Sequence, residues 1–200
     1  MCRGLASAAM LVFCLWTASG DAREFSAERV VKSGKNTVTA QVNAKDDRWR
    51  FEYSHPQRWG ANVVIVRADQ DRAWMILSKR RQYAEVPIAP EHRLNVGEAM
   101  PGEQSREFVG AQTLNGYPTE LFEVTVGEEG GARQYYRWVT KQERFPIKTV
   151  SKQGDWSEEY RHLIFTEQSS FLFELPQRLD PVEPPPGKSG GEQGDEQKGA

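Results

Sequence analysis

The chain has 200 residues, a formal net charge of −2 and 38% hydrophobic residues, with a low mean hydropathy of −0.68. This length suits one domain. The charge argues against a strongly basic nucleic-acid binder, the hydropathy against a protein with several membrane spans, and the two cysteines against a disulfide-dense scaffold.

Residues 1–22 have the features of a secretory signal peptide. Arg3 supplies a short positive start, and an apolar run from Leu5 to Ala18 follows without a charge. Small residues then offer cleavage after Gly20 or, as we favour, after Ala22. An uncleaved anchor is the alternative, but this run of about 14–15 residues is shorter than the roughly 18 that a spanning helix needs. We therefore expect an exported, periplasmic protein that is cleaved near Ala22.

Both cysteines, Cys2 and Cys14, lie in this first segment. The large Phe13 before Cys14 argues against lipid attachment, which needs a small residue at that place. Cleavage would leave a domain without cysteine, so we expect no thiol chemistry, no disulfide and no cysteine-bound zinc in it.

The middle of the chain alternates with a period of two, which is typical of strands. Residues 48–53 are aromatic on one face and charged on the other, whereas residues 63–66 and 73–77 are apolar on both faces. Turn compositions separate the segments at Ser33–Asn36, Ala44–Asp47, Ala68–Asp71, Asn115-Gly116, Gly127–Gly131 and Gln153–Asp155. This pattern predicts a mostly β, single domain over residues 23–180, with a curved antiparallel sheet or a half-open β-barrel.

Two local elements are predicted from particular residues. Asn115-Gly116 is the strongest hairpin signal, and Pro118 is expected to delay the strand that follows it. The candidate helix is Glu91–Met100, which Pro101-Gly102 would stop. We therefore expect one or two short helices at most.

Residues 181–200 form a stretch rich in Pro, Gly and charged residues, with Val182 and Ala200 as its apolar members. Such a composition cannot bury enough surface to offset chain entropy, so it predicts a disordered tail. The tail is either inert or serves as a spacer or docking arm.

Aromatic residues are concentrated in residues 49–74 and 117–156. They either form plain core or line an apolar cavity that accepts a hydrophobic ligand. The cavity residues that we predict are Trp49, Phe51, Tyr53, Val64, Val66, Trp74, Ile76, Tyr83, Phe122, Val124 and Trp138. Arg50 and Arg67 are candidates for a polar rim around it, or for structural pairs with Glu52 and Asp69.

Four stretches of the chain occur in an order that resembles a known family. They are Asp47–Tyr53, Val64–Ile76, Gln82–Pro87, and a group made of Val109 to Tyr117, Glu123-Val124, Trp138–Thr140 and Phe145–Thr149. Together they resemble the LolA-like envelope domains, the periplasmic lipoprotein-carrier superfamily, over residues 25–175. Lys45-Asp46-Asp47 stands where the carrier itself has an Arg-Pro pair.

The resemblance implies a half-open antiparallel β-barrel with a short helical element against its concave face. It also implies a role in holding lipid or acyl chains, or in sensing mislocalised lipoproteins. The predicted signal peptide, inferred from other residues, agrees with that setting.

Other chemistry finds little support in the sequence. His55, His92 and His162 lack metal-ligand spacing, and no nucleophile elbow or phosphate-binding motif occurs, so we expect no metal, no cofactor and no catalysis. Glu158 and Glu159 should point to opposite faces of a strand. The basic run 79–81 is either a solvated turn or a contact for acidic headgroups.

We therefore predict an exported periplasmic binding protein that holds a hydrophobic or amphiphilic ligand (a lipid, an acyl chain or a lipoprotein) without catalysis. The alternative is an envelope protein-interaction or sensory module with a filled barrel, which binds its partner through a sheet edge or the tail. Neither hypothesis includes nucleic acid as a partner or a membrane span in the mature form.

Overall fold

The structure is a computed structural model, and it describes residues 24–128 and 130–184. The predicted signal peptide, both cysteines and residues 185–200 of the predicted tail lie outside these ranges.

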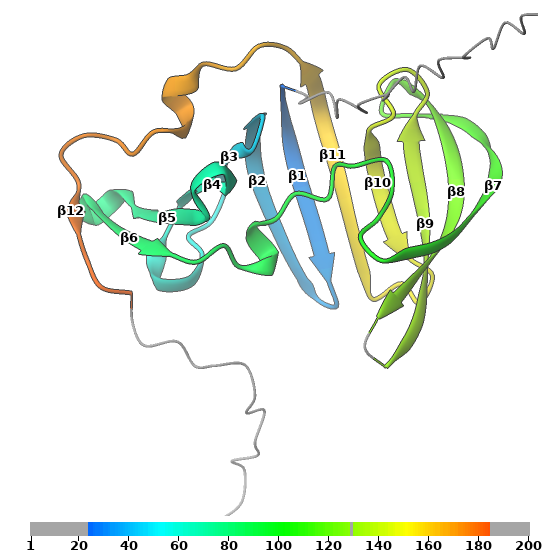
Figure 1. The fold of residues 1–200 in the computed structure, drawn as a ribbon, viewed down its shortest axis with the longest axis horizontal. Helices are drawn as coiled ribbons and strands as arrows, with labels where there is room; N and C mark the ends of the chain where they lie inside the picture. Colours follow the sequence, from blue (N-terminus) through cyan, green and yellow to red (C-terminus); the bar gives the residue numbers. More distant parts are fainter. Residues whose placement is uncertain (1–23, 129, 185–200) are drawn as a thin grey trace, which may run out of the picture.

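The described chain is built almost entirely of strands (Figure 1). They are β1 (Phe25–Ser33), β2 (Asn36–Lys45), β3 (Arg48–Tyr53), β4 (Val63–Arg67), β5 (Arg72–Leu77), β6 (Gln82–Val86), β7 (Glu103–Leu114), β8 (Tyr117–Glu128), β9 (Gly131–Thr140), β10 (Pro146–Ser151), β11 (Trp156–Phe165) and β12 (Asp180–Pro181). The helical elements between them are short 3-10 turns. The predicted mostly β class is confirmed.

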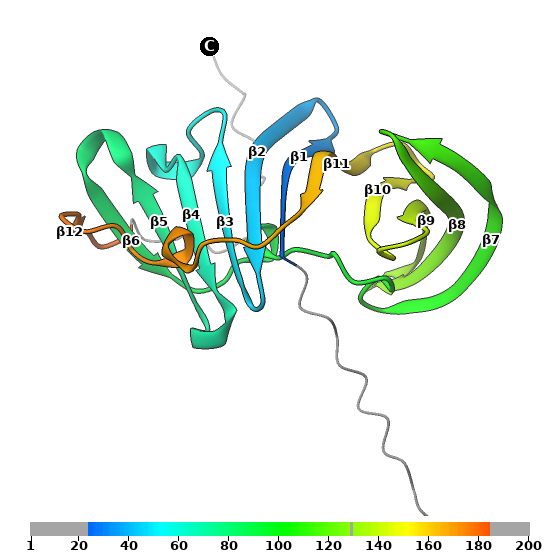
Figure 2. The same cartoon turned by 90° about the horizontal axis from the view of Figure 1, so that it is seen from above.

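All twelve of these strands belong to one sheet, in the order β12-β6-β5-β4-β3-β2-β1-β11-β10-β9-β8-β7. Neighbours pair antiparallel, except that β12 runs parallel to β6. The sheet is curved and does not close, and its last four strands, β10 to β7, curl into a roll at one end (Figure 2). Of the two predicted shapes, the structure is the open curved sheet.

Two long connections cover the two faces of this sheet. The strap, residues 87–102, runs from β6 to β7 across the face that we call the inner face (Figure 1). The outer segment, residues 166–179, leads from β11 to β12 and includes the 3-10 turn η5 (Ser170–Phe173). Its Phe173 is fully buried on the opposite, outer face.

β4 is buried along its whole length, and β5 is buried from Ala73 to Leu77, because both of their faces are covered. Val64, Val66 and Met75 belong to the inner-face core. Ile65 and Trp74, one residue away along the same strands, pack with Phe173 on the outer face. Successive side chains of a strand point to opposite faces, so each strand contributes to two separate clusters.

The predicted Asn115-Gly116 hairpin is confirmed between β7 and β8. Both residues have positive φ, 50° and 85°, as a primed two-residue turn requires. The expected delay of the second strand is wrong, because Pro118 already pairs with Thr113 inside β8. Its carbonyl accepts a hydrogen bond from the amide of Lys141 at 2.9 Å.

The predicted helix over Glu91–Met100 is wrong. A single 3-10 turn, η4 (Pro90–His92), begins one residue earlier, and Arg93 already has extended backbone angles. The rest of the strap has no regular structure because its backbone is held by side chains from distant strands.

The C-terminal end of the sheet extends past the boundary that we expected at residue 180. β12 lies along β6, and the amide of Val182 donates to the carbonyl of Tyr83. This pairing uses the backbone, so the polar composition of the stretch does not prevent it.

The buried Phe173 offers a direct test of how much the outer segment stabilises the fold. Phe173→Ala should lower the free energy of unfolding by about 3–5 kcal/mol, because it leaves a cavity in the outer cluster. Phe171→Ala is the matched control, since Phe171 is 77% exposed two residues away, and should change stability by less than about 0.5 kcal/mol. Urea unfolding measures both, and equal effects would contradict this packing.

Candidate functional site

A cavity of about 650 Å³ lies between the inner face of the sheet and the strap. This volume is within the range of about 300–1,000 Å³ that is usual for small-molecule sites. Its walls come from seven strands of the sheet, the β3–β4 loop, the strap and the C-terminal end, through Arg29, Val31, Val38, Tyr53, Gln57, Trp59, Val64, Met75, Val86, Pro87, Ala89, Pro90, Glu91, His92, Arg93, Asn95, Trp156, Glu158 and Pro184.

The strap is held over the cavity by side chains that donate to its backbone carbonyls. Trp49 on β3 donates from its indole nitrogen to the carbonyl of His92 at 2.6 Å. Arg137 on β9 donates to the carbonyls of Asn95 and Gly97, at 3.2 and 2.6 Å. Arg137 is 1% exposed, and burial, together with the charge of Arg106, lowers its pKa to about 10, so it remains cationic at neutral pH.

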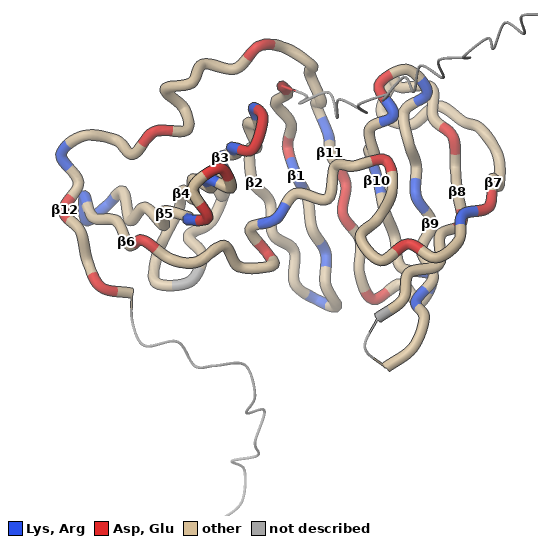
Figure 3. The backbone as a smooth tube through the Cα atoms, in the orientation of Figure 1, with Lys and Arg blue, Asp and Glu red and all other residues tan. Residues whose placement is uncertain are grey.

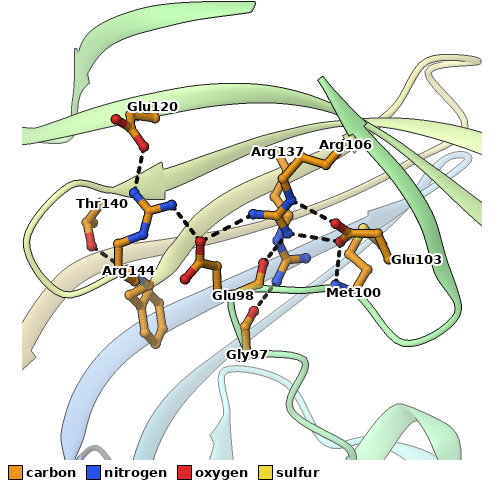
Figure 4. Close-up of polar contacts among 10 residues, drawn as sticks. Gly97, Glu98, Met100, Glu103, Arg106, Glu120, Arg137, Thr140 and Arg144 are labelled. Atoms are coloured by element: carbon orange, nitrogen blue, oxygen red, sulfur yellow. Dashed lines mark hydrogen bonds and ion pairs between the residues drawn. The ribbon is translucent and has the colours of Figure 1, made fainter. Parts of the chain in front are cut away.

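A network of charged groups fixes the far end of the strap to the β7–β10 roll (Figure 4). Glu98 on the strap lies between Arg144, at 2.5 Å, and Arg106, at 3.6 Å. Arg106 also pairs with Glu103 at 2.7 Å, and Arg144 with Glu120 at 2.6 Å. Several charges acting together restrain a segment better than an isolated surface pair does.

The floor of the cavity contains a buried ion pair. Arg29 on β1 and Glu158 on β11 lie 2.5 Å apart, with side chains only 12% and 5% exposed. The hydroxyl of Tyr160 donates to the same carboxylate oxygen at 3.0 Å. Burial opposes the charge of Arg29, but the Glu158 carboxylate outweighs it and the pKa of Arg29 is raised. Burial also raises the pKa of Tyr53 to about 12, so this phenol is neutral.

His92 is a buried polar group of the cavity wall. Its residue is 6% exposed, and among the described residues its Nδ1 has no hydrogen-bond partner. Burial lowers the pKa of His92, although the nearby Glu91 acts in the opposite direction. The Nδ1 atom is itself buried, so it is enclosed by protein and does not face the open cavity.

The predicted cavity residues do not all share this cavity. Tyr53 and Val64 line it. Phe51 and Val66 are buried in the inner-face core, and Trp49 and Trp138 pack against that core. Trp74, Ile76 and Tyr83 lie in the outer cluster, and Phe122 and Val124 lie in the cluster of the roll.

The expectation of one common wall is thus corrected. β4 and β5 are buried on both faces, so hydrophobicity alone does not indicate which of their residues face inward.

The proposed polar rim is also corrected, because Arg50 and Arg67 do not line the cavity. Arg50 pairs with Glu52 at 2.7 Å and Arg67 with Asp69 at 2.8 Å, which is the structural role that we considered as the alternative. Arg67 also pairs with Glu174 of the outer segment at 3.0 Å. These arginines hold the outer segment on the sheet.

Sequence reasoning missed Arg29, Glu158, His92 and Trp59 as members of the site. One signal was present, since Glu158 shares its strand face with Trp156 and Tyr160. A carboxylate on an otherwise aromatic face indicates a buried partner. His92 and Trp59 lie in irregular loops, where periodicity carries no information.

Within the described ranges there is neither a cluster of metal-ligating side chains nor a helix that could span a membrane. No three His, Asp or Glu side chains there group into a potential metal site. Among the same residues, none of the helical turns is long and apolar enough to cross a membrane.

Acidic and basic residues are interspersed over both halves of the sheet (Figure 3).

No family model matches the sequence, and no curated protein matches it. Solved structures do share its fold. An uncharacterized conserved protein from Thermus thermophilus is 15% identical with a TM-score of 0.55, and the match covers 82% of this chain and 91% of that one. MucB is 11% identical with a TM-score of 0.55, over 79% of this chain and 59% of MucB.

The Pseudomonas aeruginosa MucA/MucB complex matches with a TM-score of 0.53 and 14% identity, over 80% of this chain and 58% of that one. The chain thus spans less than three fifths of the MucB chains that it matches. At these identities the likeness concerns the fold alone.

Burial of His92 predicts a pH dependence of stability. Its pKa is lowered in the folded state from the ordinary 6.5, so its contribution is complete above about pH 6.5 and is lost as the pH falls through the lower folded value. His92→Gln should remove this part of the decline in melting temperature below about pH 6.5. His55→Gln, at an exposed histidine, is the control. Identical profiles for His92→Gln and the wild type would contradict the assignment.

Proposed function

We propose that this protein is an exported periplasmic binding protein that holds a hydrophobic or amphiphilic ligand in the cavity under the strap, without catalysis. The observation that supports this most is the cavity itself, about 650 Å³ in volume. The apolar residues that line it include Val31, Val38, Val64, Met75 and Val86. The periplasmic location rests on the predicted signal peptide.

Apolar burial would supply the affinity. About 25 cal/mol is gained for each Å² of apolar surface removed from water, before the cost of ordering the ligand is subtracted. The polar groups of the floor are largely paired with one another, as Arg29 is with Glu158, so they do not demand a charged ligand.

A second candidate function is the binding of an envelope protein. β7 is a 12-residue edge strand of the sheet, with Phe108 and Val109 58% and 51% exposed. MucB, which shares the fold, has been solved in complex with MucA. We expected a filled interior for this function, so the open cavity favours ligand binding over it.

Blocking the cavity tests the proposal. Val38→Trp places a large side chain at the cavity wall and should weaken the binding of a saturated fatty acid at least about tenfold, a loss of about 1.4 kcal/mol. Val109→Trp, the same change at the exposed β7 edge, should leave affinity within about twofold of the wild type. Isothermal titration calorimetry measures both. Equal affinities of Val38→Trp and the wild type would contradict binding in this cavity.

A further inference from the structure

A second, smaller chamber adjoins the cavity. Its volume is about 260 Å³, and it is lined by Trp59, Leu77, Arg80, Gln82, Ala84, Val182 and Glu183. Trp59 also lines the larger cavity. This tryptophan therefore contacts both spaces.

The two chambers lie on the same face of the same two strands. Met75 and Val86 line the larger chamber, whereas Leu77 and Ala84, each two residues away along its strand, line the smaller one. Residues two apart on a strand share a face and are separated by about 6–7 Å. Met75 and Ala84 are direct partners in the β5–β6 pairing. The apolar surface is therefore continuous from one chamber to the next.

The C-terminal end of the described chain follows the same path. Val182 and Glu183 line the smaller chamber, and the next residue, Pro184, lines the larger one. Both chambers are thus lined by β5 and β6 on one side and by the chain after β12 on another. Trp59 is the residue that lines both of them.

The backbone of Trp59 is held in an unusual conformation. Its φ is 64°, which is uncommon and costly for a bulky aromatic residue. The loop around it imposes this angle, because the amide of Gln57 bonds the carbonyl of Ala61 at 2.6 Å and the amide of Gly60 bonds the carbonyl of Gln57 at 2.9 Å. Such strain persists only where surrounding contacts over-determine it, and here it occurs at the residue that lines both chambers.

We propose that the Trp59 indole is a partition that sets the greatest length of apolar chain that the site accepts, and that the smaller chamber takes the end of a longer acyl chain when the indole is removed. This inference rests on the proposed function, since it needs an apolar chain in the larger chamber. It assigns Trp59 as a specificity-determining residue for a single-chain amphiphile.

A series of saturated fatty acids of increasing length, titrated by calorimetry, tests the partition. In the wild type, affinity should rise about fourfold for each added methylene until the chain reaches Trp59, and then stop rising. In Trp59→Ala the rise should continue over several further methylenes. Trp138→Ala is the matched control, because Trp138 lines neither chamber, and it should leave the length limit unchanged.

A double variant separates the partition from a general gain in volume. Val182→Trp fills the smaller chamber, so adding it to Trp59→Ala should return the limit to the wild-type length. If Trp59→Ala fails to fold, as judged by circular dichroism, Trp59→Leu takes its place and should shift the limit in the same direction.

The outcomes distinguish the two hypotheses. If the wild type binds no fatty acid of any length, the proposed function fails and the partition fails with it. If the wild type binds but a folded Trp59 variant keeps the same length limit, the partition is overturned and the proposed function stands. An equal shift in Trp138→Ala, or no reversal by Val182→Trp, also overturns the partition.

Discussion

A single open sheet has two faces, and this chain must cover both without a second layer of sheet or helix. The strap and the outer segment do so with almost no regular structure. Backbone groups in such segments have no neighbouring strand to pair with, yet a buried carbonyl needs a hydrogen-bond donor. Arg137 and Trp49 supply those donors to the strap, and Arg50 donates to the carbonyl of Leu172 in the outer segment.

The way in which the strap is held explains why a cavity exists under it. Trp49 fixes the strap near His92, and the Arg137 and Glu98 contacts fix it at its far end over the roll. Side-chain tethers fix a segment at points, so the space between strap and sheet need not be filled as it is under a packed helix. Ile88, Leu94 and Val96 of the strap pack against the inner-face core, and Phe173 fills the space beneath the outer segment.

The sequence allowed much of the sheet to be predicted and little of the site. Alternation and turn residues marked the strands, and Asn115-Gly116 marked its hairpin, because these signals are local. The strap was misread as a helix because its tethers come from strands up to about 40 residues away, as from Arg137 to Gly97. Trp74 was assigned to the wrong face because β5 is buried on both faces. Arg67 and Asp69, two residues apart on one strand and its turn, were correctly considered as a pair.

The central claim is that the space under the strap is a ligand site. Native mass spectrometry tests this claim most directly. The sample is the full chain, expressed with its N-terminal segment and purified from the cell envelope without detergent. The account predicts an added mass that organic solvent releases as a lipid or acyl compound, and that Val38→Trp lacks. A wild-type protein that carries no added mass, and gains none after incubation with fatty acids or lipopeptides, would contradict it.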